Sequence, residues 1–155
     1  MRFEGPFRYR VAVLPLPDPR LFEVTDTGGN TKLSAQARSS LPKLYVVTVD
    51  EAPIYAGMTR QSIRSRLRFG WTAKGKSGYY GYQWRHVYQE VALDLWCNVD
   101  PPEKNPMLDA ETIEAEIVFL IRQKGQWPLY QTEIHFHPSN PDHRRIAEAI
   151  ARRYP

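Results

Sequence analysis

Cysteine is almost absent from this sequence, which has one, Cys97, in 155 residues. A single thiol excludes an intramolecular disulfide and cannot form a thiolate metal cluster within one chain. Long apolar runs are absent too, and Arg8 and Arg10 interrupt the N-terminal apolar residues where a secretion signal would be continuous. These absences predict a cytoplasmic protein that does not enter a membrane.

Acidic residues are absent between Arg60 and Gln89, although the whole chain has a formal net charge of only +4. Aromatic residues and glycines are interleaved with the cations of this stretch. Cations neutralise phosphates and aromatic rings stack on bases, so the stretch is a candidate contact surface for DNA. Its candidate DNA-binding residues are Arg60, Arg64, Arg68, Lys74, Lys76, Arg85 and His86. The alternative is an exposed loop whose aromatic residues cover the core.

Two tyrosines ten residues apart, Tyr45 and Tyr55, each lie in a short run rich in β-branched residues. The acidic, proline-containing connection at 50–53 predicts a β-hairpin, which would carry both hydroxyls on adjacent strands. After Gly57, Ile63 and Leu67 are four residues apart and predict a helix packed on the sheet, with Arg66 beside that face. Two phenols and a guanidinium are therefore expected to converge at one edge.

A second helix is expected from Asp109, as its N-cap, to Gly125, its stop signal. An apolar stripe runs along it, and at 100° per residue Glu114 and Glu116 fall on opposite flanks of that stripe. Helical geometry alone does not choose between the two glutamates.

This ordered set resembles the GIY-YIG nuclease superfamily over residues 43 to about 136. Tyr55-Ala56-Gly57-Met58-Thr59 matches the second motif, whereas the first motif matches only at Tyr45, because Lys43-Leu44 replaces Gly-Ile. Arg66-Leu67 stands at the family's arginine. Glu116 is taken as the family's helical glutamate, with Glu114 as second choice, and Gln131 of Pro128-Leu129-Tyr130-Gln131 replaces the family's asparagine.

The resemblance implies a metal-dependent endonuclease that hydrolyses phosphodiester bonds of double-stranded DNA as a monomer or homodimer. Glu116 would bind one Mg²⁺ or Mn²⁺, and Arg66 would contact the scissile phosphate. Tyr45 would take a proton from the attacking water and Tyr55 would orient that water, although the two roles are exchangeable. Gly57, Thr59 and Gln131 would support the site.

One position departs from the family. A histidine or tyrosine often follows the arginine by one helical turn, and here that position is Gly70. A substitute could come from the following loop, whose candidates are Lys74, Lys76, Tyr79, Tyr80, Tyr82 and His86. The departure motivates an alternative function, a catalytically degenerate DNA-binding module that keeps the scaffold.

The resemblance implies an α/β (α+β) fold with a small central antiparallel sheet flanked by helices. We divide the chain into an N-terminal extension (1–42), a GIY-YIG-like core (43–137) and a C-terminal helix packed on the core (138–155). Further strands are expected at 7–16, 21–25 and 87–96, a short helix at 33–41 and a loop at 98–107.

Alternation at 132–137 predicts one more strand, with His135 and His137 on one face. Such a pair could contribute to a zinc site if another histidine joined it, and this is a second alternative to the nuclease.

Overall fold

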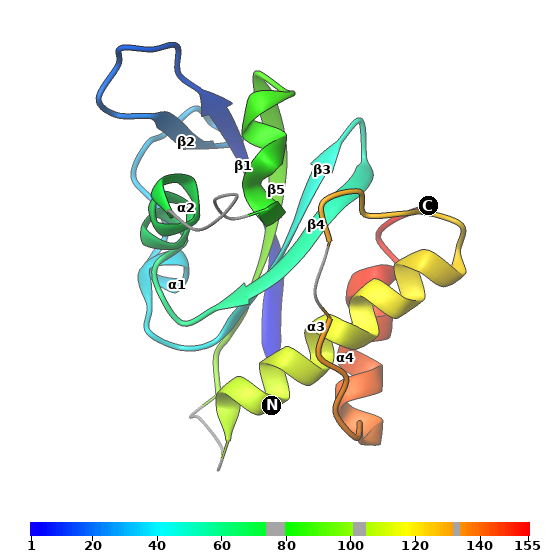
Figure 1. Ribbon diagram of the computed structural model, residues 1–155. Coiled ribbons are helices and arrows are strands. Elements are labelled where there is room, and N and C mark those ends of the chain that lie inside the picture. Colours follow the sequence, from blue (N-terminus) through cyan, green and yellow to red (C-terminus); the bar gives the residue numbers. More distant parts are fainter. Residues whose placement is uncertain (74–79, 101–104, 132–133) are drawn as a thin grey trace.

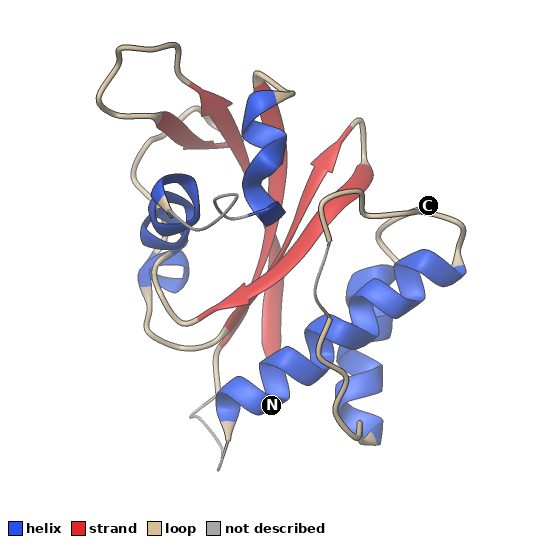
Figure 2. Ribbon diagram, viewed as in Figure 1, coloured by secondary structure: helices blue, strands red, loops and turns tan. Residues whose placement is uncertain are grey.

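A computed structural model describes residues 1–73, 80–100, 105–131 and 134–155. Within these residues, five strands form one sheet in the order β2-β1-β5-β3-β4, and every neighbouring pair is antiparallel. The expected antiparallel sheet with flanking helices is thus present (Figures 1 and 2). The strands are β1 (Phe3–Val13), β2 (Phe22–Asp26), β3 (Lys43–Val49), β4 (Ala52–Thr59) and β5 (Glu90–Asn98).

Helices cover both faces of this sheet (Figure 1). On one face lie α1 (Ala35–Arg38), α2 (Ile63–Thr72) and the 3₁₀ segment η1 (Tyr80–His86); on the other lie α3 (Pro106–Gln123) and α4 (Pro141–Ala151). Alternate residues of β3 therefore enter two separate cores: Tyr45 and Val47 pack beneath α2 and η1, whereas Leu44 and Val46 pack beneath α3 and α4. This two-sided burial explains why the strand is apolar at nearly every position.

The first 42 residues contribute to the same sheet. β1 pairs with β5 from Phe3 to Ala12, and β2 pairs with the outer edge of β1. Strands are present near 7–16 and 21–25 as expected, although β1 (Phe3–Val13) begins and ends earlier than expected and β2 is shifted by one residue to Phe22–Asp26. The N-terminal segment therefore widens the sheet on the side of β5 that faces away from the hairpin.

A buried carboxylate ties both ends of the chain to this sheet. Asp94 on β5 is fully buried and accepts hydrogen bonds from Arg8 Nε at 2.8 Å, Arg153 Nε at 3.2 Å and the Tyr154 hydroxyl at 2.8 Å. Burial works to raise the pKa of Asp94, but the hydrogen bonds from Arg8, Tyr154 and Arg153 outweigh it and hold that pKa below its ordinary value. Asp94 therefore links β1, β5 and the C-terminus as an ionised group.

Two local expectations were wrong. α3 begins at Pro106 with Asn105 as its N-cap, not after Asp109, because proline in the first helical turn gives up no intrahelical hydrogen bond. The second concerns the strand expected at 132–137: residues 132–133 lie outside the described residues, and 134–137 form no strand. The chain meets the edge of β4 slightly earlier, where the Tyr130 amide donates to the Ile54 carbonyl at 3.0 Å.

Candidate active site

Tyr45 and Tyr55 lie on the paired strands β3 and β4, as the sequence predicts. The register sets Val47 opposite Tyr55 and Tyr45 opposite Gly57, so both phenol rings project from the same face with their centroids 5.9 Å apart. A Cβ at Gly57 would lie 2.6 Å from the Tyr45 hydroxyl oxygen and 2.9 Å from the Tyr55 ring. The glycine in this motif is therefore required for the two rings to pack across the strand.

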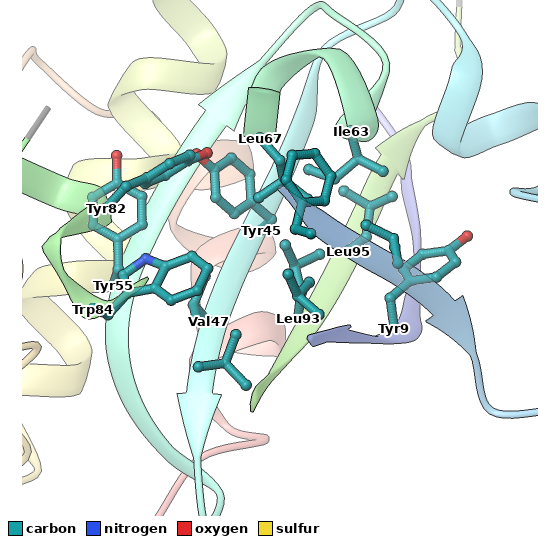
Figure 3. Close-up of a cluster of buried hydrophobic side chains, with 14 of the residues drawn as sticks. Tyr9, Tyr45, Val47, Tyr55, Ile63, Leu67, Tyr82, Trp84, Leu93 and Leu95 are labelled. Atoms are coloured by element: carbon teal, nitrogen blue, oxygen red, sulfur yellow. The ribbon is translucent and has the colours of Figure 1, made fainter. Parts of the chain in front are cut away.

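A third phenol, that of Tyr82 from η1, completes the cluster (Figure 3). Its hydroxyl oxygen lies 2.8 Å from that of Tyr45, and its ring meets the Tyr55 ring edge-on at 5.8 Å. A Cβ at Gly70 would lie only 2.2 Å from the Tyr82 ring. Tyr82 was one of several substitutes that the sequence offered for the side chain missing at Gly70, and its ring fills the space beside that glycine.

Arg66 on α2 faces this cluster. The helix begins after Ser62, whose hydroxyl caps the Ser65 amide, and the turn before it is held by Thr59, whose hydroxyl accepts from the Gln61 amide at 3.0 Å. Arg66 is half-buried, and its guanidinium carbon lies 5.5 Å from the centroid of the Tyr82 ring. The structure thus places Arg66 against the ring of Tyr82, which in turn contacts both Tyr45 and Tyr55.

The two glutamates of α3 differ in their surroundings. Burial raises the pKa of Glu114 to about 8; the nearby Glu111 carboxylate adds to the rise, and the Arg66 guanidinium opposes it. Glu114 and Arg66 are therefore within electrostatic reach of each other.

Glu116 lies on another side of α3. The Asp109 carboxylate is hydrogen-bonded to the His143 ring of α4, and the Lys124 ammonium donates a hydrogen bond to the Ala151 carbonyl of α4. The flank of α3 that carries Asp109 and Lys124 therefore faces α4. Glu116 is seven residues after Asp109, and two helical turns place it on that flank. Of the two glutamates left open by the sequence, Glu114 lies away from the flank that faces α4, and the Arg66 charge acts on its pKa.

Glu114 was the second choice from the sequence. The spacing from Glu116 to Leu120-Ile121 is one residue longer than the resemblance implies, and this was the signal against Glu116.

Gln131 supports the hairpin from outside. Its side-chain oxygen accepts a hydrogen bond from the Ala56 amide at 2.9 Å, and both residues are buried. Because β4 is the edge strand, this amide points away from β3 and needs another acceptor. The extra methylene relative to asparagine does not prevent this contact.

Lys43, which stands where the family has glycine, is fully buried at the start of β3. Its ammonium donates to the carbonyl oxygens of Ser39, Leu41 at 2.9 Å and Gln61 at 3.1 Å. It thereby joins the segment after α1 to the turn between β4 and α2, and this turn positions Arg66.

The candidate DNA-binding residues differ in exposure. Arg60, Arg64, Arg68 and His86 are exposed. Arg64 donates to the Thr31 carbonyl at 2.6 Å, and the Arg68 guanidinium lies 5.7 Å from the Phe22 ring centroid.

Arg85 is half-buried and donates to the Tyr82 carbonyl at 2.9 Å, and burial lowers its pKa. It is therefore engaged in holding η1. Lys74 and Lys76 lie outside the described residues.

The zinc alternative gains no support from the part of the chain that the structure describes, which contains no group of three or more histidine, cysteine, aspartate or glutamate side chains able to hold a metal ion. His135 is exposed, and His137 Nε2 lies 3.5 Å from a Glu111 carboxylate oxygen. Among the described residues, no helix combines the length and apolar character needed to cross a bilayer.

Comparisons with protein-family models, with curated proteins and with solved structures found no match to this chain. The functional interpretation therefore rests on the residues themselves, above all on the cluster formed by Tyr45, Tyr55, Tyr82 and Arg66, whose guanidinium charge acts on Glu114.

Proposed function

We propose that this protein is a metal-dependent DNA endonuclease with a GIY-YIG-type site. The observation that carries the proposal is the convergence of five elements: phenols from β3, β4 and η1 pack together, the Arg66 guanidinium of α2 lies beside the Tyr82 ring, and the Arg66 charge acts on Glu114 of α3. These groups match what phosphodiester hydrolysis needs: a cation for the phosphate, a base for the water and a carboxylate for a metal ion.

Arg66 would bind the scissile phosphate. Its guanidinium is always charged and offers parallel N–H donors that fit two phosphate oxygens, so it would position the phosphorus and stabilise charge that grows in the transition state. Lysine would present a single point charge in its place and would not reproduce this fork.

Tyr45 is the proposed proton acceptor for the attacking water, and Tyr55 would orient the water or the phosphate. Gly57 has no side chain that would displace either ring. A phenol acts as a base only when ionised, so Tyr45 would have to lose its own proton before it takes one from the water.

Glu114 would hold the divalent cation. Mg²⁺ accepts a single carboxylate and keeps most of its water ligands, so Glu114 alone would be a sufficient protein ligand. When bound, the cation would supply Lewis-acid stabilisation of the phosphate. A carboxyl with a pKa of about 8 must lose its proton to bind the cation, so binding would release a proton at neutral pH.

A DNA-binding module without turnover is the second candidate, and one observation favours it: Tyr45 is 1% exposed and Tyr82 is fully buried. An attacking water must reach the phenol that takes its proton. For an endonuclease, substrate must approach from the side where Arg66 and Glu114 keep partial exposure.

Nicking of supercoiled plasmid with Mg²⁺ or Mn²⁺ distinguishes these candidates. We expect wild-type protein to nick, and Arg66→Lys and Glu114→Gln to lose the activity while they still bind a labelled duplex. Glu116→Gln is the matched variant on the opposite flank of α3 and is expected to nick normally. Duplex binding by the wild type without nicking would support the binding module, whereas loss of nicking in Glu116→Gln alone would assign the metal to Glu116.

A further inference from the structure

The hydroxyl groups of Tyr45 and Tyr82 form a buried pair. Their oxygens are 2.8 Å apart, a normal distance for an O–H···O bond, and both side chains are at most 1% exposed. Each phenol can donate one hydrogen bond and can also accept one, so either hydroxyl can serve the other as donor.

The position of Tyr82 is fixed from several sides. Its ring lies against Gly70, where even a methyl group would clash, and packs on the rings of Tyr55 at 5.8 Å and Trp84 at 5.7 Å. Its carbonyl accepts a hydrogen bond from Arg85 at 2.9 Å. The hydroxyl is consequently held in one place with little rotational freedom and points at Tyr45 (Figure 3).

We propose that Tyr82 is a positioning residue for Tyr45: it directs the Tyr45 oxygen and donates a hydrogen bond to that oxygen when Tyr45 is ionised. This inference rests on the endonuclease function proposed above. It assigns a role to a residue outside both tyrosine motifs, and it accounts for Gly70, because any side chain at position 70 would displace the donor.

The proton balance of the step is simple. Tyr45 first loses its proton to solvent, and the resulting phenolate takes one proton from the attacking water. The hydroxide formed attacks phosphorus, and the leaving oxygen departs and takes a proton from solvent. Tyr45 is then protonated as it was at the start, and the solvent has gained one proton and given up one. Tyr82 keeps its own proton throughout and only donates the hydrogen bond, which is stronger to an ionised oxygen than to a neutral one.

Tyr82→Phe tests this role because it removes the hydroxyl and keeps the ring. Tyr9→Phe is the matched control: Tyr9 is also buried in this core, and its hydroxyl bonds Ser34 at 3.3 Å, away from the site. Single-turnover cleavage of a labelled duplex is measured against pH for both variants, together with duplex affinity and thermal unfolding.

We expect Tyr82→Phe to bind DNA like the wild type, to cleave roughly 10–100-fold more slowly at neutral pH, and to recover rate as pH rises, because a hydrogen bond to an ionised group contributes a factor of this size. Tyr9→Phe should keep the wild-type rate and pH profile. A Tyr82→Phe protein with wild-type rate and pH profile would overturn the inference while leaving the endonuclease standing. A wild-type protein that binds duplex DNA and never cuts it would overturn the proposed function and the inference together.

Discussion

The ring of Tyr82 occupies the space that a side chain at position 70 would need, since a Cβ on Gly70 would lie 2.2 Å from its Cε2 atom and 2.4 Å from its Cδ2 atom. Position 70 is within α2 and position 82 is within η1, so the glycine of one element and the tyrosine of the other form a single packing unit. Glycine normally weakens a helix, and its presence inside α2 is explained by this ring.

A double-mutant cycle follows from this packing. Gly70→Ala should destabilise the wild type by about 2 kcal/mol, because a well-packed ring must move to admit the methyl group. In a Tyr82→Ala background the same change should stabilise the protein by up to about 1 kcal/mol, because the space is open and alanine favours helix over glycine. Urea unfolding of the four proteins measures both effects, and equal effects in the two backgrounds would contradict the packing.

Removal of the Gln131 side chain should loosen the edge of the hairpin. Gln131→Ala leaves the buried Ala56 amide without the acceptor seen at 2.9 Å, at a cost of about 1–3 kcal/mol. Amide hydrogen exchange should report faster exchange at Ala56. Gln123→Ala, which truncates an exposed glutamine of α3, serves as control and should change stability by less than about 0.5 kcal/mol. Unaltered protection of Ala56 in Gln131→Ala would argue against the contact.

Glu114 should make stability depend on pH in an unusual direction for a carboxyl. Its pKa rises from 4.5 to about 8 on folding, so between these values the folded protein keeps a proton that the unfolded chain has lost. The contribution of Glu114 to stability is therefore complete below pH 4.5 and is lost as pH rises through about 8.

Glu114→Gln should abolish this component and be more stable than the wild type above pH 8, by on the order of 1–3 kcal/mol. Thermal unfolding across pH, with Glu116→Gln as control, measures the difference. Mg²⁺ should raise the melting temperature of the wild type most at alkaline pH and should not raise that of Glu114→Gln. A wild-type profile that matches Glu114→Gln at every pH would contradict the raised pKa.

Asp94 should give the opposite pH dependence. Its pKa is held below the ordinary value, so its stabilising effect is present above pH 3.8 and disappears as pH falls through the lower, folded-state pKa. Asp94→Asn should cost about 3–5 kcal/mol at neutral pH, because Arg8 and Arg153 lose a buried ionic partner. The difference between the two proteins should narrow on acidification.

The control for Asp94 is Asp100→Asn. Asp100 is 41% exposed and lies 3.7 Å from Arg2, and exposed pairs contribute little, so its loss should cost less than about 1 kcal/mol. Equal losses in the two variants would show that burial does not set the strength of the Asp94 interactions.

Much of the fold and part of the candidate site were predictable from local patterns. The hairpin follows from two β-branched runs around an acidic turn, and α2 follows from the spacing of Ile63 and Leu67, both fully buried. The convergence of Tyr45, Tyr55 and Arg66 followed from these elements, because a strand or helix period fixes which side chains share a face.

Tertiary packing decided the residue contacts that strand and helix periodicity does not determine. Glu114 and Glu116 are equivalent with respect to the apolar stripe of α3, and they differ only because one flank meets α4. Tyr82 reaches Tyr45 across 37 residues of sequence, and Gln131 reaches Ala56 across 75. The sequence by itself determined which side chains project from the same face of each strand or helix. The partners that those side chains meet were decided by how the elements pack, because long-range contacts depend on the whole sheet and both of its helical layers.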